Sequence, residues 1–147
     1  MFDVSIIIRS KNEEDYLGSC LQSIKKQTIK NIEIILVDNF STDATCAVAK
    51  SFGIKKIIKI KKYKPGLALN LGIKESDSEF ISCLSAHCIP KNESWLETLI
   101  NSIRLDAKIV GVYGRQLPLP FTSYDNRRDL TLTFGKEDRL QKIDYMF

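Results

Sequence analysis

This 147-residue chain lacks features that several common protein classes require. No apolar run reaches the ~18–20 residues of a membrane-spanning helix. The N-terminal stretch MFDVSIIIRSKNEED has no basic segment before its apolar part, so we expect no signal peptide. Without a sign of export, the four cysteines are expected to be reduced thiols in a cytoplasmic protein: Cys20, Cys46, Cys83 and Cys88.

Motifs of three further classes are also missing. No Gly-x-Gly-x-x-Gly follows the first apolar run, where RSKNEE stands instead, and this excludes a dinucleotide-dependent dehydrogenase. Strong zinc signatures pair two close-spaced ligand sets, whereas Cys83, His87 and Cys88 form one loose set. Neither an aromatic nor an arginine-rich reading motif accompanies the lysines, so nucleic acid is not an expected partner.

The chain does have a globular composition, with 44% hydrophobic and 27% charged residues, and one concentrated basic stretch. Lys55–Lys64, KKIIKIKKYK, holds six lysines in ten residues. Two interpretations remain open. The lysines can protect an edge strand against aggregation, or they can attract a polyphosphate ligand or the anionic inner face of a membrane.

Short β-branched runs alternate with amphipathic segments through residues 1–113. The runs at 3–9, 32–37, 55–60, 79–84 and 108–114 predict strands, and the segments between them predict helices. The alternation predicts an α/β fold with a mostly parallel sheet and helices on both faces, a Rossmann-like architecture. Residues 114–147 have weak periodicity and predict an irregular or helical extension.

Polar residues follow the predicted strands and are the candidates for a site. Parallel sheets bind ligands beyond the carboxyl ends of their strands. The candidates are Arg9 to Glu13 after the first strand, Asp38, Asn39 and Ser41 after the second, and Ser85 to His87 after the fourth. We expect them on one rim. Asn12 and Ser41 are also predicted to cap the helices that follow, and Gly53 to end the second helix.

Four stretches resemble the motifs of family 2 glycosyltransferases of the GT-A type, including those of bacterial polysaccharide synthesis. VSIIIRSKNEEDYLGSCLQSIKKQ resembles the opening strand and helix, with Arg9-Ser10-Lys11-Asn12 where Pro-Thr-Tyr-Asn is frequent. IEIILVDNFSTDAT resembles Val-Asp-Asp/Asn-x-Ser-x-Asp, and PGLALNLGI resembles a shortened Gly-x-x-x-Ala-x-Asn-x-Gly. FISCLSAHCIPKNESWLETLI is similar to the stretch around the family's Asp-x-Asp. The resemblance covers about residues 3–120.

The resemblance implies a nucleotide-sugar donor bound at the rim and a sugar or lipid-linked acceptor. It also implies that Asp38 accepts hydrogen bonds from the base or ribose, although a cap or turn role before Ser41 is an alternative. At Gly66, the resemblance implies that the backbone approaches the ribose or diphosphate, and that Asn70 supports this loop. The implied donor-binding residues are Arg9, Lys11, Glu13, Asp38, Asn39, Gly66, Asn70 and Ser85.

One motif departs from the family pattern. Ser85-Ala86-His87 stands where Asp-x-Asp normally contacts the nucleotide and binds a divalent metal, Mn²⁺ or Mg²⁺. His87 can still bind Mn²⁺ through a neutral imidazole, although Mg²⁺ prefers oxygen ligands. It can instead contact the diphosphate without a metal, or make only a structural hydrogen bond. These three roles of His87 remain open.

The resemblance also implies a catalytic base, in inverting members a carboxylate late in the chain and often in a Glu-Asp pair. The charged neighbours of Glu137-Asp138 favour a solvated helix face for that pair. We therefore expect the base beyond Phe147, in the acceptor half of the enzyme. The chain is then a donor-binding portion, and a non-catalytic nucleotide-binding module of the same fold is the alternative.

Overall fold

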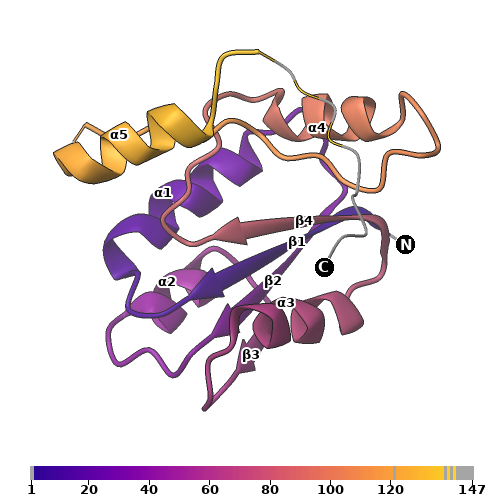
Figure 1. The fold of residues 1–147 in the computed structure, drawn as a ribbon. Helices are drawn as coiled ribbons and strands as arrows, with labels where there is room; N and C mark the ends of the chain where they lie inside the picture. Colours follow the sequence, from indigo (N-terminus) through magenta and orange to yellow (C-terminus); the bar gives the residue numbers. More distant parts are fainter. Residues whose placement is uncertain (1, 121, 138, 140, 142–147) are drawn as a thin grey trace.

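The computed structural model describes residues 2–120, 122–137, 139 and 141 (Figure 1). Strands and helices alternate through most of this range, as predicted. The elements are β1 (Phe2–Ser10), α1 (Glu14–Lys25), β2 (Ile32–Asp38), α2 (Thr45–Ser51), β3 (Lys56–Lys59), α3 (Pro65–Lys74), β4 (Ser78–Ser85), α4 (Trp95–Ile103) and α5 (Tyr124–Thr133). No helix in the described ranges is long and apolar enough to cross a membrane.

The four strands form one parallel sheet in the order β3-β2-β1-β4. Because all strands run the same way, their carboxyl ends meet at one edge. The register places Ser10 opposite Asp38 and Arg9 opposite Ser85 at that edge. The predicted α/β fold class is therefore confirmed, and the strand-end residues lie where the candidate site was expected.

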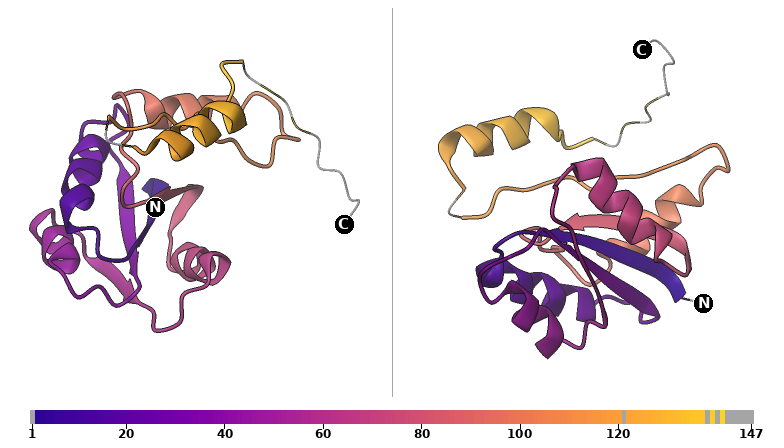
Figure 2. Two further views of the ribbon diagram at one scale, coloured as in Figure 1. Left: turned by 60° about the vertical axis from the view of Figure 1, so that its left-hand side comes forward. Right: turned by 90° about the horizontal axis from the view of Figure 1, so that it is seen from below.

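Helices cover both faces of the sheet (Figure 2). The apolar side chains of β1 alternate, so Val4, Ile6 and Ile8 face one core while Ile7 faces the other. Residues of α1, α2 and α4 complete the first core. The helix α3 covers the opposite face over β1 and β2, with Ala68 fully buried.

Two of the predicted helix boundaries are wrong. Asn12 does not cap α1, because its backbone is left-handed at φ 52° and its side chain accepts a hydrogen bond from Thr42 N instead. Ser41 does not cap α2, which begins at Thr45 after Ala44. Gly53 does end α2, with φ 82°, a conformation that favours glycine.

The predicted strand at 108–114 is also wrong, because this described segment has no strand hydrogen bonds. It lies beside α4, and Gly114 lies 3.5 Å, measured from a Cβ built on it, from Trp95 Nε1. Val110 is 78% exposed. This apolar run therefore has the hydrophobic pattern of a strand but does not pair with one. The strand β4 remains an edge of the described sheet.

A polar cluster near the amino ends of the strands contains Glu33, which is only 6% exposed. Its Oε2 accepts hydrogen bonds from Ser5 Oγ at 2.6 Å and from Asp77 N at 3.2 Å. Its Oε1 lies 2.7 Å from Lys56 Nζ. Burial opposes the charge of Glu33, but these bonds from Lys56, Ser5 and Asp77 outweigh it and lower its pKa below the usual 4.5.

This lowered pKa predicts an acid-sensitive contribution of Glu33 to stability. A carboxyl whose pKa is lower in the folded state stabilises the fold above its unfolded pKa, and this contribution is lost as pH falls through the folded pKa. We expect the free energy of unfolding, measured in urea from pH 7 to pH 3, to fall less steeply below about pH 4.5 in Glu33→Gln than in the parent. Glu79→Gln, on the 66% exposed partner of Arg104, is the matched control. Parallel pH profiles of the parent and Glu33→Gln would contradict the assignment.

Candidate donor site

The rim at the carboxyl ends of β1, β2 and β4 brings together the residues predicted from the strand ends. Asp38 lies at its centre and is fully buried. Its Oδ1 accepts hydrogen bonds from Ser10 Oγ at 3.1 Å and from Ser41 Oγ, and its Oδ2 accepts one from Ser41 N at 3.0 Å. The turn role of Asp38 is therefore present, and a direct contact with a nucleotide stays a prediction.

The two loops on either side of Asp38 are tied together through side chains. Ser41 Oγ accepts from Asn12 N at 2.9 Å, and Asn12 Oδ1 accepts from Thr42 N at 2.9 Å. Thr45 Oγ1 accepts from the backbone N of Glu13 at 2.7 Å. These bonds join Ser41, Thr42 and Thr45 to the segment after β1, and they hold the two loops together.

Arg9 spans the gap between β4 and the loop after β3. Its Nη2 donates to Ser85 Oγ at 3.0 Å, and its Nη1 donates to the hydroxyl of Tyr63 at 3.2 Å. Its Nε is buried and has no acceptor among the described residues. Tyr63 was not among the residues predicted for the site, although it is an aromatic residue within the lysine-rich stretch and could have been noticed there.

His87 lies in the turn after β4 and contacts Glu13 across the rim. Its Nδ1 is 2.8 Å from Glu13 Oε1, and the two side chains are 56% and 18% exposed. This pairing was not predicted, because the two residues are 74 positions apart. This contact fixes the orientation of the His87 ring through Nδ1. Nε2 is then the ring nitrogen that does not contact Glu13.

The remaining predicted residues lie around this centre. Lys11 Nζ donates to the backbone oxygen of Asn39 at 3.2 Å, which joins the loops after β1 and β2. Gly66 and Asn70 lie on exposed positions of α3, which begins directly after the loop that carries Tyr63. Glu137 lies at an exposed position beyond α5, and Asp138 is outside the described residues.

The described residues do not fit a preformed divalent-metal site. No group of three or more His, Cys, Asp and Glu among them could hold an ion. The oxygens of Asp38 already accept bonds from Ser10 and Ser41, and Glu13 and His87 contact each other. A metal at His87 stays a prediction that requires further ligands from a diphosphate.

The thiols near the rim add no metal ligands. Burial raises the pKa of both Cys83 and Cys88 above the usual 9.0, and Arg9 only partly opposes this. Zinc and other metals bind the thiolate, so protonated thiols are poor ligands. The set of Cys83, His87 and Cys88 also does not form a group that could hold a metal ion among the described residues.

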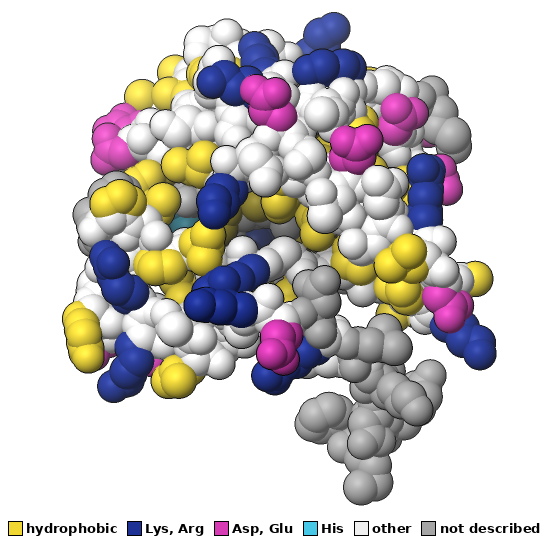
Figure 3. All heavy atoms as spheres, turned by 90° about the horizontal axis from the view of Figure 1, so that it is seen from above, with side chains coloured by type: hydrophobic (Ala, Val, Ile, Leu, Met, Phe, Trp, Pro, Cys, Tyr) yellow, Lys and Arg dark blue, Asp and Glu magenta, His cyan; other side chains and the backbone are white. Residues whose placement is uncertain are grey.

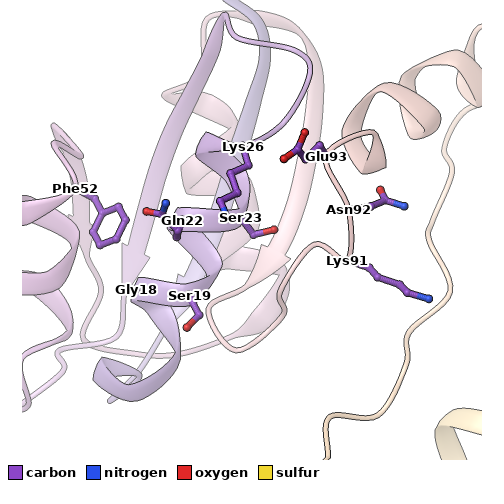
Figure 4. Close-up of a pocket in the computed structure, with 9 residues that line it drawn as sticks. All are labelled: Gly18, Ser19, Gln22, Ser23, Lys26, Phe52, Lys91, Asn92 and Glu93. Atoms are coloured by element: carbon purple, nitrogen blue, oxygen red, sulfur yellow. The ribbon is translucent and has the colours of Figure 1, made fainter.

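Two hollows accompany these elements. A groove of about 1160 Å³ is lined by β4, α4, residues 110–119 and α5, and it includes His87. The face seen in Figure 3 is hollowed, with Lys and Arg side chains around the hollow. A separate pocket of about 600 Å³ lies on the outer side of α1, among Gln22, Phe52 and Lys91 (Figure 4). No predicted site residue lines this second pocket.

Known proteins match both the sequence and the fold. The family model for glycosyl transferase family 2 matches residues 5–145. Glycosyltransferase GlyG of Streptococcus pneumoniae is 33% identical over 113 residues, which are 73% of this chain and 37% of that relative. The chain thus spans little more than a third of that relative's length.

Solved structures agree with this match. Staphylococcus aureus TarS in complex with UDP-GlcNAc has a TM-score of 0.64 and 25% identity, covering 80% of this chain and 37% of that one. The mannosyltransferase PcManGT from Pyrobaculum calidifontis, solved with GDP-Man and Mn²⁺, shares the fold with a TM-score of 0.62 at 19% identity over 70% of this chain and 32% of that one. The predicted family is confirmed: the chain belongs to glycosyl transferase family 2.

Proposed function

We propose that this chain binds the nucleotide-sugar donor of a glycosyltransferase that transfers the sugar to a sugar or lipid-linked acceptor. The observation that carries the proposal is the convergence of Arg9, Asp38, Ser85 and His87 at one rim, from three separate strands of a family 2 fold. Such a rim is where parallel α/β sheets bind nucleotides. The solved TarS complex with UDP-GlcNAc supports the same class of donor here.

The rim offers each part of a donor a suitable partner. We propose that the nucleoside is bordered by Lys11, Asn39 and the loop held by Asp38, which are joined by hydrogen bonds within the rim. We propose that the diphosphate is bordered by Arg9, Ser85 and His87 on the other side of the rim. In an inverting transfer, the acceptor oxygen forms a bond to the anomeric carbon while the bond to the diphosphate oxygen breaks. A base takes the hydroxyl proton, and we place that base beyond Phe147.

A non-catalytic nucleotide-binding module is the second candidate. The Ser-Ala-His turn in place of Asp-x-Asp favours it. Both candidates require nucleotide binding, and only the first requires transfer of the sugar to an acceptor. The edge position of β3 supports the protective role of the lysines in Lys55–Lys64, and contact with an anionic membrane remains a further proposal.

Thermal unfolding with nucleotide sugars tests the proposal. We expect at least one of the UDP-, GDP-, dTDP- and CMP-linked sugars to raise the midpoint, because a ligand at 100 times its Kd stabilises by about 2.7 kcal/mol. For a domain of this size this is a rise of roughly 5–10 °C. The matching free sugars without a nucleotide are the control. If none of the donors, with or without Mn²⁺, changes the midpoint, the proposal is wrong.

A further inference from the structure

Arg9 carries a positive charge that nothing in the described rim compensates. Its Nη atoms donate to two neutral hydroxyls, those of Ser85 and Tyr63, at 3.0 and 3.2 Å. None of the ion pairs among the described residues includes Arg9. Its Nε is buried and donates no hydrogen bond to any described residue. Holding a partly buried cation without an anion is costly, so the position favours an anionic ligand.

The carboxylates of the rim cannot take this role or gather a metal in its place. Asp38 already accepts bonds from Ser10 Oγ, Ser41 Oγ and Ser41 N, and it has no exposed surface. Glu13 lies 2.8 Å from His87 Nδ1. The rim therefore offers a diphosphate a fixed cation, but it offers a divalent ion no set of carboxylates.

Three of the rim residues depart from the family pattern that the sequence resembles. Arg9 stands where proline is frequent, and Ser85 and His87 stand at the two aspartate positions of Asp-x-Asp. Relative to that pattern, the chain has two carboxylates fewer and one guanidinium more. The structure joins the first two of these positions by the bond from Arg9 Nη2 to Ser85 Oγ. An aspartate at position 85 would pair with Arg9 and neutralise it, whereas serine orients the guanidinium and leaves its charge available.

We infer that Arg9, in place of a divalent metal ion, supplies the positive charge that binds the donor diphosphate in this protein. The inference rests on the proposed function and names the residue that recognises the diphosphate. Each Nη atom of Arg9 keeps a second N–H, and two parallel N–H donors match two phosphate oxygens. When the bond between the anomeric carbon and the diphosphate breaks, its electron pair stays on the diphosphate oxygen. Arg9 stabilises that negative charge.

Calorimetric titration of the 147-residue chain in EDTA tests the inference. The probes are uridine and UDP, with guanosine and GDP in parallel. We expect one diphosphate to bind the parent at least tenfold more tightly than its nucleoside, and MnCl₂ to change this ratio less than threefold. Arg9→Gln is expected to lose the tenfold advantage of the diphosphate while binding the nucleoside as the parent does. A merely structural role of Arg9 would weaken both ligands alike.

Two further variants keep the test decisive if Arg9→Gln folds poorly. Ser85→Asp retains Arg9 but places a carboxylate beside it, so the advantage of the diphosphate in EDTA is expected to disappear. Lys30→Gln makes the same charge change on an exposed residue before β2, at the opposite end of the sheet, and is expected to bind like the parent.

Distinct results overturn the inference and the proposed function. If the parent prefers the diphosphate only when Mn²⁺ is present, or if Arg9→Gln and Ser85→Asp keep the preference in EDTA, Arg9 does not replace the metal. In that case the proposed function stands. If no nucleoside diphosphate or nucleotide sugar binds the parent under either condition, the proposed function itself is wrong, and the inference is lost with it.

Discussion

Gly72→Ala is expected to lower the free energy of unfolding by about 3 kcal/mol, because α3 packs its backbone directly against the sheet at this residue. A methyl group at Gly72 would lie 2.3 Å from Ile7 Cγ2 and 3.2 Å from Val37 Cγ2. Ile7 is fully buried in the central strand β1 and cannot move aside. The helix must therefore lift from the sheet, and the midpoint of thermal unfolding should fall by roughly 6–12 °C.

Gly66→Ala is the matched control for this prediction, since it adds the same methyl group to the same helix. At Gly66 an added Cβ meets no atom within 4 Å. We expect its stability to be unchanged or higher by about 0.5 kcal/mol, because alanine restricts the unfolded chain. Equal unfolding midpoints for Gly72→Ala and Gly66→Ala would show that α3 does not approach the sheet as closely as described.

The fold was predictable because period and residue type agree over most of the chain. Residues 6–8 of β1 and residues 34–37 of β2 are continuous apolar stretches, as expected for strands with helices on both faces. The segment 108–114 has an equally good pattern and forms no strand. A strand needs a partner as well as a pattern, and the hydrophobic pattern contains no information on which edge offers one. The close packing at Gly72 was likewise invisible, because it depends on the distance between two elements.

The site was predictable in position and less so in its contacts. The rule that ligands lie beyond parallel strands places Arg9, Asp38 and Ser85 at one edge without knowledge of any distance. It does not show that Glu13 pairs with His87 or that Tyr63 contacts Arg9, because those contacts depend on how the connecting loops fold. Composition also could not show that the carboxylate of Asp38 is buried and accepts hydrogen bonds from its own loop.

Asp38→Ala is expected to weaken the binding of the nucleoside diphosphate by tenfold or more and to lower stability by roughly 3 kcal/mol. The stability loss follows because Ser10 Oγ, Ser41 Oγ and Ser41 N would lose their acceptor inside the fold. The affinity loss is expected because these bonds hold the loop that we propose to border the nucleoside. Urea unfolding and calorimetric titration with UDP and GDP measure the two effects separately, and Asp38→Asn, which keeps one acceptor oxygen, is the variant to use if Asp38→Ala does not fold.

The variant Ser10→Ala separates support of the loop from direct contact with the nucleotide. It removes one hydrogen bond to Asp38 and leaves the carboxylate in place, so we expect a stability loss of about 1 kcal/mol. If Asp38 touches the ligand itself, the affinity of Ser10→Ala should stay within about threefold of the parent, which corresponds to less than about 0.7 kcal/mol. If Asp38 acts only by supporting its loop, the affinity of the two variants should fall in proportion to their stability losses. A folded Asp38→Ala with unchanged affinity would remove Asp38 from the donor site altogether.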